Sequence, residues 1–168
     1  NYQRFIDCSF LNGRYGIRNQ GINASSQETS LVIRGCNFIN QYIEGVRLTY
    51  VQDITFENNR IQFNRNYSSS TGLYLNSTDN YRVLANQIIN PTSIGFYISY
   101  SDGTTINRSL IANNFCQLSG TNTGYGFYFN SCNYVDVVYN SSHSFNTHAN
   151  SYAFYEYANQ VMLVQNNI

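Results

Sequence analysis

A motif that returns at steps of 23 to 28 residues constrains the fold of this chain more than any other feature. It reads apolar-x-x-Asn-x-apolar, and a clear copy is Phe56–Asn59–Ile61. The two earliest copies have Cys in place of Asn. The column of central residues is Cys8, Cys36, Asn59, Asn86, Asn113, Asn140 and Asn166. A fixed period of this length is typical of stacked repeats, in which each repeat contacts only its neighbours.

A second motif lies out of phase with the first and reads glycine, apolar, any residue, usually apolar. Its copies start at Gly16, Gly45, Gly72, Gly95, Gly126 and Ala153. Alternation of this kind, rich in Val, Ile, Phe and Tyr, predicts short strands, and no segment has a sustained helical period. Longer polar spacers around Asn23–Ser30 and Asp102–Asn107 predict surface loops.

These patterns predict an all-β chain in which each repeat is one coil of a parallel β-helix. We expect about six to seven coils of about 26 residues, forming one domain over residues 1–168. Like residues then stack about 4.8 Å apart. Inward Asn side chains can hydrogen-bond from coil to coil as a ladder, and Asn tolerates the left-handed backbone of a sharp bend. Cys8 and Cys36 are small enough to replace Asn there, so we expect free thiols rather than a disulfide.

Composition excludes several classes of function. The nine basic residues are all Arg, and nine acidic residues bring the formal net charge to zero. No excess of positive charge is present to drive nucleic-acid binding, and no run of 18 apolar residues predicts membrane insertion. We find no cysteine spacing typical of a metal site and no nucleotide-binding motif, so we expect no metal and no cofactor. His143 and His148 share the segment Ser141–Ser151 and are expected to be solvated loop residues.

Asparagine accounts for 26 residues, so chance glycosylation motifs are expected. The five Asn-x-Ser/Thr sites start at Asn23, Asn66, Asn76, Asn107 and Asn140.

The chain begins with Asn1, its only Met is Met162, and both ends fall inside strand motifs. We therefore expect a segment of a longer chain, with flanking sequence or neighbouring chains covering both ends.

The residue two positions after each glycine is expected to point outward from its strand. These residues form the column Arg18, Arg47, Tyr74, Tyr97, Tyr128 and Tyr155. Tyrosine rings stack on sugar faces and their hydroxyls give directional hydrogen bonds, while Arg can grip a carboxylate or sulfate. The column is the predicted substrate-binding site for a glycan. A subunit interface or a plain sheet surface would also explain it.

Three carboxylates are candidates for catalysis: Glu44, Asp136 and Glu57. Glycoside hydrolysis requires two carboxyl groups about 5–9.5 Å apart. Glu44 directly precedes Gly45, close to Arg18 and Arg47, and is the first choice; a surface ion pair is the other interpretation. Asp136 is expected in an outward position beside Thr55, Arg82 and Ser109, and Glu156 in an inward one.

Copies such as Val83–Asn86–Ile88, with strands such as Gly72-Leu-Tyr-Leu, resemble the pectate-lyase-like right-handed parallel β-helix superfamily. The resemblance covers the whole chain and implies a right-handed β-helix. The superfamily includes pectate lyases, polygalacturonases, uronan epimerases and bacteriophage tailspikes. The acidic calcium cluster of pectate lyases and the paired-Asp motifs of polygalacturonases are not evident here, which puts both chemistries in doubt.

Among these relatives the chain is most like a tailspike or tail-fibre segment. Few charges, abundant Asn, Tyr and Ser, and unpaired thiols suit a phage protein that matures in a reducing cytosol. We expect a homotrimer in the virion tail, or another extracellular location, that binds a bacterial surface polysaccharide and acts on it as a depolymerase. A non-catalytic structural or adhesive spike, and a bacterial polysaccharide lyase or epimerase, are the alternatives.

Overall fold

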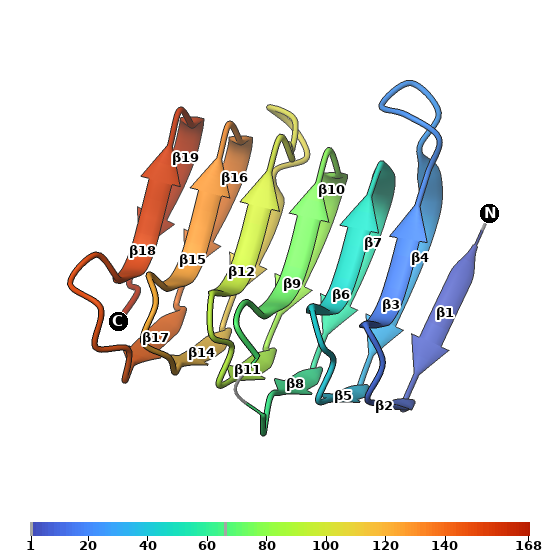
Figure 1. The fold of residues 1–168 in the computed structure, drawn as a ribbon. Helices are drawn as coiled ribbons and strands as arrows, with labels where there is room; N and C mark the ends of the chain where they lie inside the picture. The colour runs from blue at the N-terminus through green and yellow to red at the C-terminus, as the bar shows by residue number, and fades with distance from the viewer. Residues whose placement is uncertain (1, 66) are drawn as a thin grey trace.

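The computed structural model describes residues 2–65 and 67–168. Asn66, one of the five glycosylation motifs, lies outside them. The described chain forms three parallel sheets that wrap around a common core as a solenoid (Figure 1). It has about six coils of about 27 residues, so the predicted right-handed parallel β-helix is confirmed.

Sheet A is the seven-stranded sheet at the back of the solenoid in Figure 1. Its strands, in spatial order, are β1 (Gln3–Ile6), β4 (Glu28–Arg34), β7 (Val51–Glu57), β10 (Asp79–Leu84), β13 (Ser109–Ala112), β16 (Asn133–Val138) and β19 (Gln160–Gln165).

Sheet B contains the short strands along the bottom of Figure 1, and sheet C the row of longer strands in front. Sheet B consists of β2 (Ser9–Leu11), β5 (Asn37–Ile39), β8 (Arg60–Gln62), β11 (Gln87–Ile89), β14 (Phe115–Leu118) and β17 (Ser141–Ser144). Sheet C consists of β3 (Tyr15–Gln20), β6 (Glu44–Thr49), β9 (Thr71–Asn76), β12 (Ile94–Ser99), β15 (Tyr125–Asn130) and β18 (Tyr152–Tyr157).

Each coil passes through sheets A, B and C in turn, so every strand pairs with its equivalents in the coils before and after. The register stacks like on like: Phe56 pairs with Val83, which pairs with Ile111. These inward side chains are fully buried, as are Leu73 and Phe96 in sheet C. The core is therefore a bundle of apolar columns running along the solenoid axis.

The predicted Asn ladder exists, but two of its members were placed one residue too early. The buried residues are Asn114 and the half-buried Asn167; Asn113 and Asn166 are exposed and have φ of 58° and 54°. Side-chain amide nitrogens donate to the next amide oxygen at 2.9–3.0 Å along Asn59, Asn86, Asn114, Asn140 and Asn167. In each Asn-Asn pair, the first residue takes the left-handed bend and the second points inward.

The same shift corrects the outward column of sheet A. Leu110, not Ser109, lies between Arg82 and Asp136, because Ser109 pairs with Val135 and is buried.

The cysteines are free thiols, as predicted for Cys8 and Cys36. Cys36 occupies the ladder level, where its backbone N–H donates to Asn59 Oδ1 at 2.9 Å. Burial raises the pKa of the Cys36 thiol, and raises the pKa of Cys132 to about 11. Thiols kept protonated by apolar surroundings are packing groups rather than nucleophiles.

The two predicted loops connect β3 to β4 and β12 to β13, although Glu28–Ser30 already belongs to β4. The loop predicted for Ser141–Ser151 begins later than expected, because Ser141–Ser144 forms β17. His143 lies in this strand and pairs with Gln117, whereas His148 is in the following loop. Both histidines are exposed. Glu156 pairs with the buried Phe129 but is itself exposed in the final coil.

Candidate functional site

The predicted outward column is continuous in the structure. Arg18, Arg47, Tyr74, Tyr97, Tyr128 and Tyr155 are paired one to the next across the six strands of sheet C. We call this set the Arg/Tyr column. It runs along the solenoid axis on the outer face of sheet C, the front row in Figure 1.

The rings of the Arg/Tyr column contact each other. Tyr74 and Tyr97 are stacked with centroids 4.8 Å apart, and Tyr97 meets Tyr128 edge to face at 5.1 Å. Tyr128 meets Tyr155 in the same way at 5.0 Å. Aromatic pairs prefer these two geometries, so the rings hold one another in place. The result is a half-buried aromatic ridge whose hydroxyl groups lie along a strip of the surface.

A second outward column on the same face was missed by the sequence reasoning. Its members directly precede the glycine of each copy, or Ala153 in the last copy, and pair across the sheet; they are Tyr15, Glu44, Thr71, Ile94, Tyr125 and Tyr152. We call this set the flanking column. Tyr125 contacts Tyr128 at 5.0 Å and Tyr152 contacts Tyr155 at 5.2 Å, so two tyrosine columns merge at the C-terminal coils. The available signal was a tyrosine at this position in three of the six copies, before Gly16, Gly126 and Ala153.

The glycines explain why both columns face outward although their members are three residues apart. A Cβ built on Gly72 would lie 2.5 Å from the Ile88 side chain and 2.7 Å from the Gly95 carbonyl oxygen. The glycine thus presses against the core and breaks the alternation of the strand. Residues on both sides of it, such as Tyr125 and Tyr128, then share the outer face.

The N-terminal part of this face is charged rather than aromatic. Arg47 donates to Glu44 at 3.1 Å and lies over the Tyr74 ring at 4.2 Å, while Arg14 and Arg18 each lie 5.5 Å from the Tyr15 ring. Glu44 is 5% exposed, and burial raises the pKa of its carboxyl against the opposing pull of nearby arginines. The face therefore has a cationic end and an aromatic end.

The three candidate catalytic carboxylates are not brought together. Glu57 pairs with Arg34 at 3.0 Å and Asp136 with Arg108 at 2.7 Å, both on sheet A, whereas Glu44 is on sheet C. Three coil steps separate Glu57 from Asp136, about 14 Å at the usual strand spacing. That exceeds the separation used by two-carboxylate glycosidases. Each of these carboxylates is an ion-pair partner, and its catalytic role stays a prediction.

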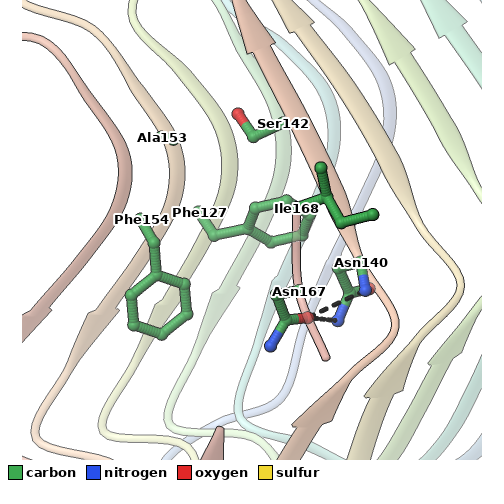
Figure 2. Close-up of a pocket in the computed structure, with 7 residues that line it drawn as sticks. All are labelled: Phe127, Asn140, Ser142, Ala153, Phe154, Asn167 and Ile168. Carbon is green, nitrogen blue, oxygen red and sulfur yellow. Dashed lines mark hydrogen bonds between the residues drawn. The ribbon is translucent and has the colours of Figure 1, made fainter. Parts of the chain in front are cut away.

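In the described part of the chain, three hollows lie away from the Arg/Tyr column: one cavity at the end of the core and two grooves on the surface. A cavity of about 120 Å³ lies between the last coils. Figure 2 shows Phe127, Phe154 and Ile168 around it, beside the ladder pair Asn140–Asn167. Its lining continues the core columns into the last coil, where Ile168 is exposed, so the cavity is the end of the core. A groove of about 380 Å³ lies at the turns from sheet B to sheet C, and one of about 200 Å³ on the outer face of sheet A.

Metal and membrane signatures are not found in residues 2–65 and 67–168. No three His, Cys, Asp or Glu side chains of these residues gather closely enough to hold an ion. None of these residues belongs to a helix that is long and apolar enough to cross a bilayer.

Comparison with known proteins gives one positive result. Searches of curated proteins and of solved structures return no match. A family model described as a right-handed beta helix region matches residues 1–168, the full length. This fold is compatible with polysaccharide-binding and lyase-like proteins. The coil period, the parallel register and this match together show that the chain belongs to the right-handed β-helix family.

Proposed function

We propose that this chain is the β-helix of a receptor-binding spike, of the kind found on bacteriophage tails, and that it binds a bacterial surface polysaccharide. The observation that carries the proposal is the unbroken Arg/Tyr column on one flat sheet face. Successive members are about one strand spacing, about 4.8 Å, apart. That spacing is comparable to one sugar ring, so a glycan chain lying along the axis can meet a new side chain at each coil.

The chemistry of the face suits a glycan of mixed character. The rings of Tyr97 and Tyr128 offer apolar surface to sugar faces, and their hydroxyls can donate and accept hydrogen bonds. Tyrosine hydroxyls are protonated donors at neutral pH, and burial raises the pKa of the Tyr74 and Tyr128 hydroxyls further. Arg18 supplies an exposed guanidinium for an acidic substituent.

The proposed setting in a phage spike is supported by the free thiols. All four cysteines are free and three are buried, which suits a protein that folds in a reducing cytosol. The proposal includes assembly as a homotrimer and a location in the virion tail or outside the cell. Light scattering tests the assembly: trimers are expected at micromolar concentration, and monomers alone would contradict it.

The direct test is a panel of bacterial capsular and O-antigen polysaccharides, assayed for binding and then for products by mass spectrometry. Fragments that have gained water indicate hydrolysis, and then Glu44→Gln must abolish cutting if Glu44 is the acid. Fragments with an unsaturated end indicate a lyase with Arg18 or Arg47 beside a uronate. Binding with intact polymers supports a spike that only binds, and no binding across a broad panel contradicts the proposal.

A structural or adhesive spike is the second candidate, and the exposed tyrosines favour it. Tyrosine is enriched at protein interfaces, and Tyr152 and Tyr157 are 41% and 61% exposed. If the aromatic end of the face is a contact between chains, the Arg/Tyr column is covered in the assembly. Substitution of its tyrosines then dissociates the oligomer instead of weakening glycan binding.

A further inference from the structure

A groove separate from the Arg/Tyr column lies at the edge where sheet B turns into sheet C. The turn between β11 and β12 spans only residues 90–93, whereas the turns on either side span residues 63–70 and 119–124. The short turn between two longer ones leaves a hollow of about 380 Å³. Ligand pockets start at about 300 Å³, so the groove has room for a small ligand.

The walls of the groove are ordered by hydrogen bonds between the turns. Thr92 forms part of the wall, is 6% exposed, and donates from its hydroxyl to the Tyr67 carbonyl at 2.8 Å. The Asn122 side chain donates to the Ser68 carbonyl at 3.4 Å, which links the two longer turns. Gly120, with φ of 144°, takes a backbone conformation that other residues rarely adopt. These contacts between the turns therefore fix the shape of the groove.

The lining chemistry is uncharged and rich in hydroxyl groups. Among the described residues that form it are Ser68, Ser119 and Thr121, together with the Asn122 amide and the Tyr67 ring. Tyr67 is held by an edge-to-face contact with Tyr42 at 4.9 Å. An aromatic ring beside several small hydrogen-bonding groups matches a neutral sugar, since no lining charge compensates an ionic ligand.

The groove also lies close to the proposed binding face. Asn122 is three residues before Tyr125 of the flanking column, so their Cα atoms are at most about 11 Å apart. Thr92 is two residues before Ile94 of the same column. A sugar in the groove is therefore within about two rings of a glycan on the aromatic end of the face.

We propose that this groove is a subsite for a neutral pyranose, and that it receives a side branch of the polysaccharide held on the Arg/Tyr column. The branch assignment rests on the proposed function, whereas sugar binding in the groove does not. The ligand class is thus a branched glycan with an uncharged branch sugar.

Titration of isotope-labelled protein with glucose, galactose, mannose and N-acetylglucosamine, followed by NMR amide shifts, tests the groove. We expect saturable shifts at Gly120 and Asn122 for at least one sugar, with a millimolar dissociation constant typical of a ligand this small. Thr121→Trp, which fills the groove, and Asn122→Ala, which removes an amide, should both abolish the shifts. Thr105→Trp, on an exposed loop at another edge, is the matched control and should retain them. No groove shifts with any of the four sugars would overturn the subsite.

A polysaccharide that binds in the panel separates the two proposals. Thr121→Trp should weaken binding of this polysaccharide about tenfold, which corresponds to about 1.4 kcal/mol, while Thr105→Trp should have no effect. Unchanged affinity with Thr121→Trp, in a protein whose aromatic face still binds, would overturn the branch assignment and leave the proposed function standing. Monosaccharide shifts in the groove, with no polymer on the aromatic face, would support the subsite and contradict the proposed function.

Discussion

The Asn ladder inside the solenoid and the Arg/Tyr column outside it repeat one residue type on successive coils, but they differ in what holds each member. Asn114 donates to Asn140 and to the Val83 carbonyl and accepts from Asn86, all at 2.8–3.0 Å. The Tyr97 side chain is held by ring contacts with Tyr74 and Tyr128. The inner residues are required by folding, because buried amides must be satisfied. Cross-strand pairs like the outer ones contribute about 0.2–1 kcal/mol each, so folding alone does not require those tyrosines.

The largest expected effect comes from breaking the inner column. Asn114→Ala removes the acceptor of the Asn86 backbone N–H and of one Asn86 side-chain N–H in the core, and should lower the free energy of unfolding by about 2–5 kcal/mol. Asn113→Gly is the neighbouring control, because Asn113 is exposed in a left-handed bend that glycine accepts. It should change stability by less than about 0.5 kcal/mol. Urea unfolding measures both, and equal losses would contradict the register.

The glycine of each coil but the last packs the strand that bears the Arg/Tyr column against the core, and its substitution should have the next largest effect. Gly72→Ala places a methyl group against Ile88 and the backbone of the next coil, and should cost about 1–3 kcal/mol through overpacking. Gly124→Ala is the control, since its Cβ would meet chiefly the end of the Asn146 side chain at 2.6 Å, which can move. Thermal melting compares the two, and a neutral Gly72→Ala would argue against the close approach of the sheets.

Glu44 belongs to the flanking column on the outer face of sheet C, but its side chain is buried like those of the Asn ladder. Because its pKa is raised above 4.5 by burial, the folded protein holds this proton more tightly than the unfolded chain does. Its contribution therefore falls as pH rises from about 4.5 through the raised pKa. Glu44→Gln should remove that decline, with a smaller effect than Gly72→Ala. Urea midpoints across the acidic range measure it, and superimposable pH profiles for the two proteins would be the contrary result.

The smallest effect is expected for an ion pair outside both columns. Arg34 and Glu57 have side chains that are 47% and 28% exposed, and exposed pairs contribute little. Glu57→Gln should change the unfolding free energy by about 0.5 kcal/mol or less and leave polysaccharide binding unchanged. Calorimetric binding and urea titration check both. A loss of binding or of product formation would restore Glu57 as a site residue.

The sequence predicts the fold well because the solenoid is built from a local period that appears directly in the chain. The coils, the parallel stacking, the free thiols and the Arg/Tyr column all follow from which residue types recur. The ladder register fails at Asn113 and Asn166 because each is the first of two adjacent asparagines. Which of the two points inward depends on the backbone conformation, and Asn113 has a φ of 58°. Two identical residues in a row give no indication of which one adopts that conformation.

The candidate site was predicted only in part, for a similar reason. Strict alternation places Tyr125 inward, but the close packing of Gly126 against the core reverses it, and Tyr152 pairs with Tyr125 in the same column. The ion pair of Glu44 with Arg47 was one of the two interpretations offered from the sequence. The pairing of Glu57 and Asp136 with arginines could not be predicted from spacing alone, because Arg34 and Arg108 come from other coils. The side groove depends on the lengths of three successive turns, which the repeat pattern leaves open.

The central claim is that the Arg/Tyr column binds a polysaccharide, and a double substitution tests it most directly. Equilibrium binding of a panel-positive polysaccharide should be compared between the native chain and Tyr97→Ala/Tyr128→Ala, with assembly followed by light scattering. Stacking of a nucleic-acid base on one aromatic side chain is worth about 1–3 kcal/mol, and with a similar magnitude for a sugar the loss of two rings should cost at least about tenfold in affinity. We predict that loss with assembly intact. Unchanged affinity, or loss of the oligomer with binding retained by the dissociated chains, would contradict the claim.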